Sequence, residues 1–351
     1  MSGITRRGMA GLAAAAFPAV AGAMEAAALN ITENPFGPSL QAKAALREAV
    51  THVERYPHAE EQALMARIAA VNGVTPAHVV ISTGALELLS MISAFWTRDG
   101  VQLAPALTYD SHIKYAARVG AQTRRVAMGP DQQIDLTAMA AGLGPDVRLT
   151  YVCNPNNPTG LLMERGALRE FCIQAAKVAP VVVDEAFIDM SPDPASESVV
   201  DLVRAGHDVV VVGTFSKSYA LAAVRIGYAI AQPDRARAIR GLLAPSRNGP
   251  GLAAAAASYR DMAYLAASNR AIEQGRQIIY RACDGGRIPY LRSAGSYVWA
   301  DFGDVAVIKR LAEQGVLLRQ FAGGDPGWAR VAVAETSAMA AFARALPKAL
   351  G

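Results

Sequence analysis

Residues 209–218 read Val-Val-Val-Val-Gly-Thr-Phe-Ser-Lys-Ser, a short apolar strand followed by two hydroxyls and a lysine, Lys217. Three other short apolar segments lead into polar or turn-forming residues, namely Asp184, Asn157 and Gly84. Strands that are apolar on both faces are typical of a parallel sheet covered by helices on both sides. Ligands bind such sheets beyond the carboxyl ends of the strands. The sequence therefore predicts that an amine, a carboxylate, an amide and a glycine turn meet in one site.

The order of the predicted elements indicates an α/β fold. From about residue 60 to residue 231, short apolar strands alternate with helical segments, which predicts βαβ units and a mainly parallel sheet. Residues 225–230 are read as one more strand. Helical stretches are then expected at residues 235–243 and 252–281. They are followed by predicted strands at residues 297–302, 316–321 and 330–333. This second part is typical of a smaller α+β domain.

The chain before the sheet is expected to form an arm. Residues 34–38 read Asn-Pro-Phe-Gly-Pro, which cannot be helical, and an amphipathic helix is expected over residues 40–53. The arm is expected to pack with the smaller domain. The predicted units are an export signal at residues 1–23, the arm at 24–55, the large domain at 56–235 and the small domain at 236–351.

Composition excludes several classes of protein. Of the 351 residues, 52% are hydrophobic and 18% are charged, so a folded chain is expected. The net charge of +4 comes without a long basic run, which argues against nucleic acid as a partner. The three cysteines and five histidines show no disulfide or metal-ligand spacing. No apolar stretch is long enough to predict a membrane-spanning helix.

The amino terminus resembles a twin-arginine export signal. Arg6-Arg7 precedes an apolar, alanine-rich stretch over about residues 10–20, and Ala21-Gly22-Ala23 offers a small-residue cleavage site. A periplasmic location is therefore expected, and a cytoplasmic protein with an unstructured amino terminus is the alternative. Twin-arginine export moves folded proteins, which suits an enzyme that is loaded with a cofactor before crossing.

Lys217 and Asp184 have the chemistry of a pyridoxal phosphate (PLP) site. A lysine at a strand end forms a Schiff base with a carbonyl cofactor, and a carboxylate pairs with a pyridinium nitrogen. Alone, Lys217 also fits an ordinary surface lysine. Val-Val-Val-Asp-Glu at residues 181–185 also resembles a Walker B strand, but the chain lacks the Walker A loop that a P-loop hydrolase needs.

The remaining motifs supply ring and phosphate contacts. Asn157 lies in the rigid loop Asn-Pro-Asn-Asn-Pro-Thr-Gly at residues 154–160, where its amide can donate to a phenolate oxygen. Gly84 opens a helix whose free N–H groups favour a phosphate. Tyr109 can stack on a planar ring, although a core aromatic fits it nearly as well. The other candidates for the phosphate cradle are Ala85, Leu86, Thr214, Ser216 and Arg225.

Two arginines on predicted strands of the small domain are candidates for a substrate carboxylate. Arg330 lies in Ala-Arg-Val-Ala-Val and Arg319 in Gly-Val-Leu-Leu-Arg. A guanidinium binds a carboxylate through two hydrogen bonds, which is the group that an amino acid presents. Arg330 is the preferred clamp, and solvated strand arginines are the alternative. A substrate with a phosphate would need further basic groups, for which Arg247 and Arg319 are candidates.

Together these motifs resemble the fold-type I, class I/II aminotransferases, and most closely the histidinol-phosphate aminotransferase group. The resemblance covers nearly the whole chain after the signal, in the family's order. The matching segments are residues 29–39 (Leu-Asn-Ile-Thr-Glu-Asn-Pro-Phe-Gly-Pro-Ser), 55–57 (Arg-Tyr-Pro), 84–87 (Gly-Ala-Leu-Glu), 108–109 (Thr-Tyr), 154–160, 184–186 (Asp-Glu-Ala), 214–217 (Thr-Phe-Ser-Lys), 225–227 (Arg-Ile-Gly) and Arg330.

The resemblance implies roles for these residues. Lys217 would hold PLP covalently and move a proton, Asp184 would pair with the ring nitrogen, and Asn157 would bind the ring oxygen O3′. Tyr109 would stack on the ring. Tyr56 would reach the phosphate in the other subunit, which implies a homodimer. The substrates implied are an amino acid and a 2-oxo acid, bound with the help of Arg330, Arg319 and Gly37.

The chain departs from the family's pattern at one position, and two other classes of PLP protein are alternatives. The family usually has tyrosine three residues after the aspartate, whereas this chain has Phe187. That difference and the export signal both weaken the case for a role in histidine biosynthesis. A PLP-dependent decarboxylase or lyase of the phosphothreonine decarboxylase type shares the same lysine, aspartate and asparagine. A non-catalytic PLP sensor would need an output domain, for which the chain has no spare length.

Overall fold

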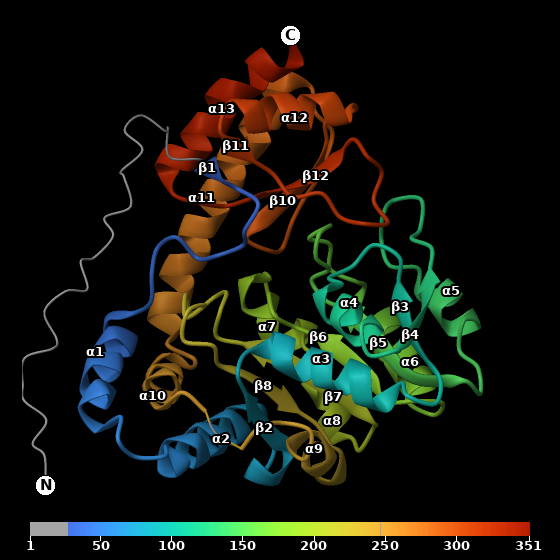
Figure 1. The fold of residues 1–351 in the computed structure, drawn as a ribbon, viewed down its shortest axis with the longest axis vertical. Coiled ribbons are helices and arrows are strands. Elements are labelled where there is room, and N and C mark those ends of the chain that lie inside the picture. Colours follow the sequence, from blue (N-terminus) through green and yellow to red (C-terminus); the bar gives the residue numbers. More distant parts are fainter. Residues whose placement is uncertain (1–26, 246) are drawn as a thin grey trace, which may run out of the picture.

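A computed structural model describes residues 27–245 and 247–351, and its larger part is built on a seven-stranded sheet (Figure 1). The strand order is β2-β8-β7-β6-β5-β3-β4. β8 is antiparallel to both of its neighbours, and the other adjacent strands are parallel. The mainly parallel α/β sheet is therefore confirmed. The strands are β2 (Val79–Ser82), β3 (Val101–Pro105), β4 (Gln122–Val126), β5 (Val147–Cys153), β6 (Val181–Asp184), β7 (Val209–Thr214) and β8 (Gly227–Ile230).

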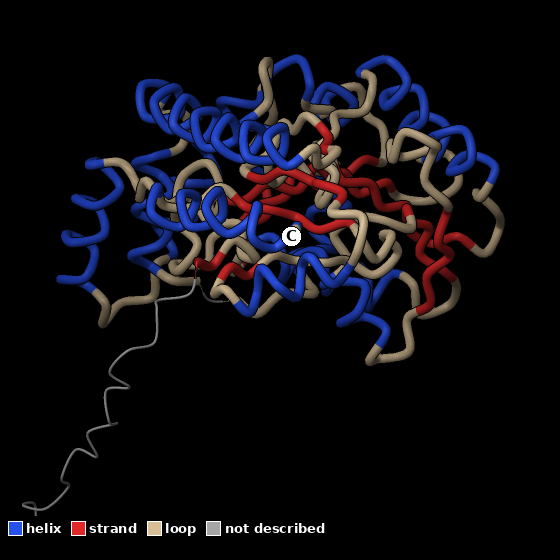
Figure 2. Tube along the Cα trace, turned by 90° about the horizontal axis from the view of Figure 1, so that it is seen from above, coloured by secondary structure: helices blue, strands red, loops and turns tan. Residues whose placement is uncertain are grey.

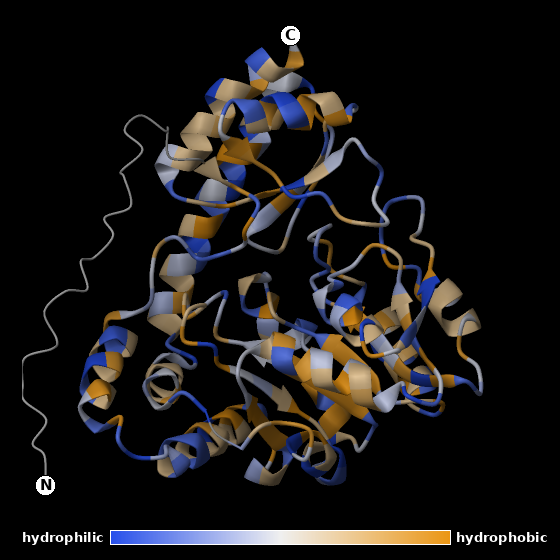
Figure 3. Ribbon diagram, viewed as in Figure 1, coloured by the Kyte–Doolittle hydropathy of each residue, from blue (hydrophilic) through white to orange (hydrophobic). Residues whose placement is uncertain are grey.

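Helices cover both faces of this sheet because alternate strand residues point to opposite sides. Val181 and Val183 of β6 belong to one core, whereas Val182 belongs to the other. Figure 2 shows helices on both sides of the strands, and Figure 3 shows the strands as strongly apolar. The first core includes α2 (His58–Asn72), α5 (Leu136–Ala141), α6 (Arg165–Ala175), α8 (Val200–Arg204) and α10 (Gly249–Ser258). The second includes α3 (Ala85–Trp96), α4 (Ser111–Ala117) and α9 (Pro233–Arg240).

The second part of the chain has its own apolar core around a three-stranded antiparallel sheet, in the order β12-β10-β9. Of the predicted strand at residues 316–321, only β11 (Val316–Leu317) forms, and it pairs in parallel with β1 (Ala27–Ala28). Arg319 adds one isolated bridge to Arg330. The elements here are β9 (Tyr290–Leu291), β10 (Tyr297–Asp301), β12 (Trp328–Ala332), α11 (Met262–Gly286), α12 (Val305–Glu313) and α13 (Thr336–Leu350).

The predicted helical stretch over residues 252–281 is wrong as a single element, because it divides into α10 and α11. Arg260, between them, has a left-handed φ of 59°, and the Asp261 side chain caps α11 by accepting from the backbone N–H of Tyr264. Leu265 of α11 packs in the core of the large sheet, whereas Ile272 packs in the second core. Helix α11 thus connects the two parts of the molecule (Figure 1). The domain boundary predicted at residue 235 lies too early, because residues as late as Leu265 still pack in the core of the large sheet.

The expectation that the whole arm packs with the small domain needs correction. Leu29 lies in the small-domain core. However, α1 (Leu40–Ala49), which continues into the 3-10 turn η1 (Val50–His52), packs against α10 of the large domain. Its Ala42 is fully buried in the large core. An amphipathic pattern shows that a helix has a buried face but not which partner covers it. The proposed export signal lies outside the described residues.

Searches for a membrane-spanning helix and for a metal site cover the described residues alone. Among residues 27–245 and 247–351, no helix has the length and apolar character needed to cross a membrane. The same residues contain no group of three or more His, Cys, Asp or Glu side chains that could hold a metal ion. The three cysteines are free and buried. The remaining short elements are η2 (Pro76–His78), η3 (Ile188–Met190) and α7 (Pro194–Glu197).

Candidate active site

A cavity of about 240 Å³ lies where the carboxyl ends of the large-sheet strands meet the arm and the small domain. Eleven of the fourteen predicted site residues line it. They are Ala85, Leu86, Tyr109, Asn157, Asp184, Thr214, Ser216, Lys217, Arg225, Arg319 and Arg330. Residues far apart in sequence thus converge on one hollow, as expected for ligand binding in an open α/β sheet.

Lys217 follows β7 and is one of the residues that line the cavity. The Nζ atom is 2.6 Å from the backbone oxygen of Thr32 and 3.2 Å from the Thr32 hydroxyl. Burial lowers the pKa of Lys217 to about 8, with a further contribution from the charge of Arg330. A measurable fraction of the amine is therefore unprotonated near neutral pH and available as a nucleophile or base.

Asp184 ends β6 and is held by two hydrogen bonds. The Tyr151 hydroxyl donates to Oδ2 at 3.1 Å, and the backbone N–H of Ala186 donates to Oδ1 at 3.0 Å. Burial raises the pKa of Asp184 to about 6, although these hydrogen bonds and Lys217 favour the charged form. A buried carboxylate with so few cationic neighbours is suited to pairing with a protonated ring nitrogen.

Asn157 and Arg330 meet across the two domains. Arg330 is only 2% exposed; its Nη1 donates to Asn157 Oδ1 at 2.8 Å and its Nη2 to the backbone oxygen of Asn30 at 2.9 Å. Because the amide oxygen of Asn157 accepts from Arg330, the amide nitrogen is left to donate elsewhere. Burial lowers the pKa of Arg330 to about 10. Its Nε has no partner among the described residues, so a ligand anion would satisfy a buried donor.

A phosphate cradle forms at the start of α3. Gly84 has φ 84°, and a Cβ there would collide with the guanidinium of Arg225. Arg225 Nη1 donates to Ser216 Oγ at 3.2 Å, and the Ser216 and Thr214 hydroxyls are 3.1 Å apart. A guanidinium, two hydroxyls and the free N–H groups of a helix amino terminus are the donors that a phosphate requires. The residues present therefore fit the phosphate of PLP.

Two aromatic side chains, those of Tyr109 and Phe187, border the cavity. Tyr109 lines the cavity, and burial raises its pKa. Phe187 also lines the cavity and packs edge-on against Tyr297, with ring centroids 5.1 Å apart. The Tyr297 hydroxyl donates to the backbone oxygen of Asn156 at 2.9 Å. The hydroxyl that Phe187 lacks is therefore not supplied by Tyr297.

Three predicted residues do not line this cavity. Gly84 is not part of the lining, and its backbone lies next to the guanidinium of Arg225. The backbone oxygen of Gly37 accepts from the Tyr264 hydroxyl at 2.8 Å, so this glycine helps to anchor the arm. Tyr56 is 77% exposed and lies in a separate hollow with Arg247. Arg247, proposed for a substrate phosphate, donates instead to the backbone oxygen of Ile81 at 3.1 Å.

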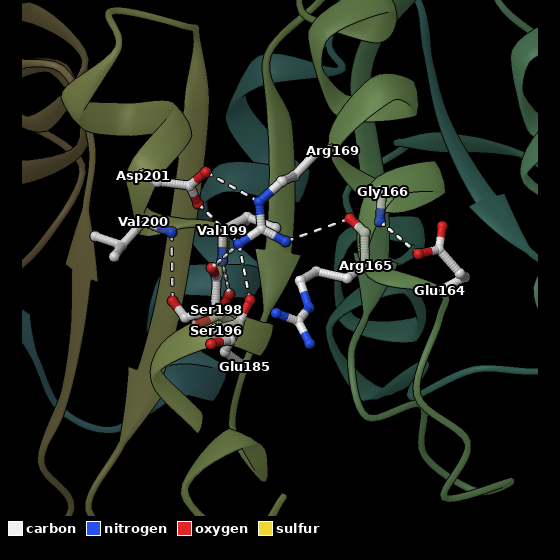
Figure 4. Close-up of polar contacts among 10 residues, drawn as sticks. All are labelled: Glu164, Arg165, Gly166, Arg169, Glu185, Ser196, Ser198, Val199, Val200 and Asp201. Carbon is white, nitrogen blue, oxygen red and sulfur yellow. Dashed lines mark hydrogen bonds and ion pairs between the residues drawn. The ribbon is translucent and has the colours of Figure 1, made fainter. Parts of the chain in front are cut away.

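Sequence reasoning missed three residues that support the site. Thr32 and Tyr151 contact the catalytic amine and carboxylate, as described above. Glu185, next to Asp184, does not line the cavity; it accepts from Ser198 Oγ at 2.7 Å and from the Val199 backbone N–H at 2.8 Å (Figure 4). Burial raises the pKa of Glu185 to about 7. The aromatic residue near the end of β5 was a possible signal for Tyr151. Thr32 lies within the matching segment 29–39, but nothing in that segment singled it out from its neighbours.

The segment bound by Glu185, residues 198–199, is also held by Arg169. Arg169 of α6 donates to the backbone oxygens of Ser196 and Ser198, at 2.9 and 2.8 Å, and forms an ion pair with Asp201 (Figure 4). The loop after β6 is therefore fastened to α6 and α8. This arrangement restrains the strand end that carries Asp184.

Comparisons with known proteins agree with this geometry. The family model described as aminotransferase class I and II matches residues 26–346. Histidinol-phosphate aminotransferase 2 of Pseudomonas fluorescens is 32% identical over 92% of this chain and 88% of its own length. Histidinol-phosphate aminotransferase of Moorella thermoacetica is 32% identical over 83% of this chain and 76% of its own length.

A solved structure shows the same fold. The crystal structure of histidinol-phosphate aminotransferase from Sinorhizobium meliloti in complex with pyridoxal-5′-phosphate superposes with a TM-score of 0.83 and 27% identity. The match covers 92% of this chain and 89% of that one. The family match over nearly the whole chain, together with a cavity that fits PLP, establishes that this protein belongs to the class I and II aminotransferases and uses PLP as its cofactor.

Proposed function

We propose that this PLP-dependent aminotransferase takes the amino group from a donor that carries an anionic group and passes it to a 2-oxo acid in a ping-pong reaction. The observation that carries this proposal is the pair of guanidiniums in the cavity, Arg330 and Arg319. Backbone hydrogen bonds of 2.8 and 3.2 Å between these two residues hold them side by side. Two adjacent cations on the substrate side favour a carboxylate or phosphate over a neutral amine.

The residues of the cavity divide the chemistry between them. When bound, PLP supplies an electron-withdrawing ring that stabilises a carbanion at the substrate Cα. Lys217, with a pKa of about 8, would hold the cofactor through its amine, and the same amine would carry the proton. Asp184, with a pKa of about 6, would pair as a carboxylate with the ring nitrogen. Arg330 orients the substrate through its anionic group.

A donor panel tests this proposal. Purified enzyme would be mixed with α-amino acids, with histidinol phosphate and with uncharged primary amines, and conversion of bound PLP to pyridoxamine phosphate would be followed by absorbance. We expect conversion with donors that carry a carboxylate or phosphate, and at least about tenfold slower conversion with neutral amines. Release of CO₂ without stoichiometric pyridoxamine phosphate would instead assign the lyase activity. Equal rates with neutral amines would contradict the role of the arginine pair.

The functional unit is proposed to be a homodimer with shared sites. The segment after α1 exposes apolar side chains, with Val53 64% and Tyr56 77% exposed. Such exposure on one segment favours burial against a second copy. A mixture of Lys217→Ala and Tyr56→Ala subunits provides the test. Shared sites predict about one quarter of wild-type activity, because half of the dimers would be mixed and each would carry one intact site. No recovery above the parent variants, or a monomer in sedimentation, would contradict the proposal.

Export to the periplasm is proposed from the sequence of residues 1–23. Arg6-Arg7, the apolar stretch and Ala21-Gly22-Ala23 support it. The expected result is that the protein appears in the periplasmic fraction and that the double variant Arg6→Lys, Arg7→Lys stays in the cytoplasm. If both proteins fractionate with the cytoplasm, the enzyme is cytoplasmic.

A further inference from the structure

We propose that Thr32 is a positioning residue for the amine of Lys217, holding it while it carries a proton. This inference rests on the proposed aminotransferase reaction and adds a residue of the arm to its proton-transfer step. The backbone oxygen and the hydroxyl of Thr32 both lie within hydrogen-bonding distance of Nζ, at 2.6 and 3.2 Å. The side chain of Thr32 therefore takes part directly in the surroundings of the reacting nitrogen.

The arm is fixed on both sides of Thr32. The Leu29 backbone oxygen accepts from the Ala332 N–H at 2.9 Å, which joins the arm to β12. The Asn34 side chain donates to the backbone oxygen of Ser218 at 3.2 Å and to Ser268 Oγ at 2.8 Å. Thr32 itself is 6% exposed. A buried residue between two anchored points has little freedom, so its oxygens are held in place for the amine.

Thr32 is expected to act on the charged form that Lys217 adopts when it takes up a proton. When the amine removes the substrate Cα proton, the C–H bond breaks, an N–H bond forms, and the electron pair stays with the substrate. The amine becomes an ammonium, which burial disfavours, and it later returns the proton. Acceptors at Thr32 stabilise this ammonium and direct it, because hydrogen bonds to the charged form favour that form.

Other charged groups near the amine also influence the pKa of Lys217. Asp184 and Glu33 favour the ammonium, whereas Arg330 and Arg225 oppose it. The Phe187 ring lies 5.6 Å from Nζ. Among these groups only Thr32 makes a direct hydrogen bond to Nζ in the described residues. Its hydroxyl can be removed without a change of shape, because valine and threonine have nearly equal volume.

The test compares Thr32→Val, which lacks the hydroxyl, with Thr32→Ser, which keeps it. In the holoenzyme, the rate of conversion of bound PLP would be measured with an ordinary donor and with a donor deuterated at Cα. We expect Thr32→Val to slow conversion about tenfold and to increase the deuterium isotope effect, with KM changed less than about twofold. Thr32→Ser is expected to stay within about threefold of wild type.

A second readout needs no turnover. In full-length protein freed of PLP, the pH dependence of reductive methylation at Lys217 would be followed by mass spectrometry. Thr32→Val is expected to move the midpoint to lower pH than in wild type and in Thr32→Ser. If Thr32→Val and Thr32→Ser behave alike in both measurements, the proposal is wrong. Failure of Thr32→Val alone to bind PLP would assign Thr32 to packing of the site and also overturn it.

The two proposals fail in different ways. If wild-type enzyme converts no donor, the proposed reaction is wrong, but the methylation midpoint still reports whether Thr32 acts on Lys217. If wild type is an active aminotransferase and the isotope effect is unchanged by Thr32→Val, only the role of Thr32 is lost. The comparison therefore separates the chemistry of the site from the contribution of the arm.

Discussion

The cavity has two walls that differ in origin and in chemistry. The strand-end wall carries Lys217, Asp184 and Asn157, each within a short motif that directly follows or ends a strand of the large sheet. The opposite wall, called the arm wall, carries Thr32 of the arm and Arg330 of β12, which lie near opposite ends of the sequence and both line the cavity. Arg330 contacts the arm through its hydrogen bond to the backbone oxygen of Asn30. The first wall suits a cofactor, and the second suits a substrate. Cofactor chemistry thus depends on local motifs, whereas substrate choice depends on tertiary structure.

The largest effect is expected at the strand-end wall. Lys217→Ala removes the amine that holds PLP and moves the proton, so kcat should fall by at least about 10³-fold, given that acid–base catalysis alone contributes roughly 10²–10⁴. Borohydride treatment followed by mass spectrometry should show a PLP adduct at residue 217 only in wild type. Lys114→Ala, at an exposed lysine that pairs with Asp110, is the control and should keep both properties. A borohydride adduct in Lys217→Ala would show that another lysine holds the cofactor.

The arm wall is expected to govern substrate binding. Arg330→Lys keeps the charge but loses the two-pronged donor that also bonds to Asn157 and Asn30. KM for donors with a carboxylate should rise about 10- to 100-fold, since hydrogen bonds to charged groups contribute roughly 1.5–3 kcal/mol. Steady-state kinetics checks this, with Arg319→Lys as the matched variant on the same wall. Equal increases in both variants would mean that Arg330 has no special role.

Glu185, which anchors the loop behind the strand-end wall, should make the free energy of unfolding depend on pH. Burial raises the pKa of Glu185 from 4.5 to about 7, so its uncharged form favours folding. This contribution is complete below about pH 4.5 and is lost as pH rises through 7, by on the order of 3 kcal/mol. Urea unfolding of protein without PLP at pH 5 and pH 8 should show this loss in wild type. Glu185→Gln should reduce it, whereas Asp234→Asn, at an exposed carboxylate, should not. An unchanged pH dependence in Glu185→Gln would show that Glu185 is not its source.

The same contrast explains what the sequence could predict. The site residues at strand ends could be predicted because each one is adjacent in sequence to an apolar strand. The position of Asp184 or Lys217 therefore follows from the strand that precedes it. The positions of Thr32 and of α1 could not be predicted, because the arm's contacts join residues about 180 to 300 positions apart. The break between α10 and α11 was missed because Arg260 adopts a left-handed conformation that its residue type does not announce.

A residue that matches a family motif does not necessarily line the cavity of its own chain. Tyr56 and Gly37 belong to matching segments, yet neither lines the cavity. The position of Tyr56 agrees with a role toward a partner subunit, which remains a proposal. Gly37 contacts Tyr264 rather than a substrate position in this chain. Family resemblance thus transfers more safely to the strand-end wall than to the arm.

The smallest expected effect concerns Phe187, which stands on the strand-end wall where the family usually has tyrosine. Phe187→Tyr adds a hydroxyl donor inside the cavity, and a donor to the ring oxygen favours its charged form. The pH midpoint of the visible absorbance of bound PLP should therefore fall, by roughly half to one unit for one hydrogen bond. Phe321→Tyr, nearby but outside the cavity lining, is the control. If the midpoint does not move, the added hydroxyl does not reach the ring oxygen, and this difference from the family has no electronic consequence.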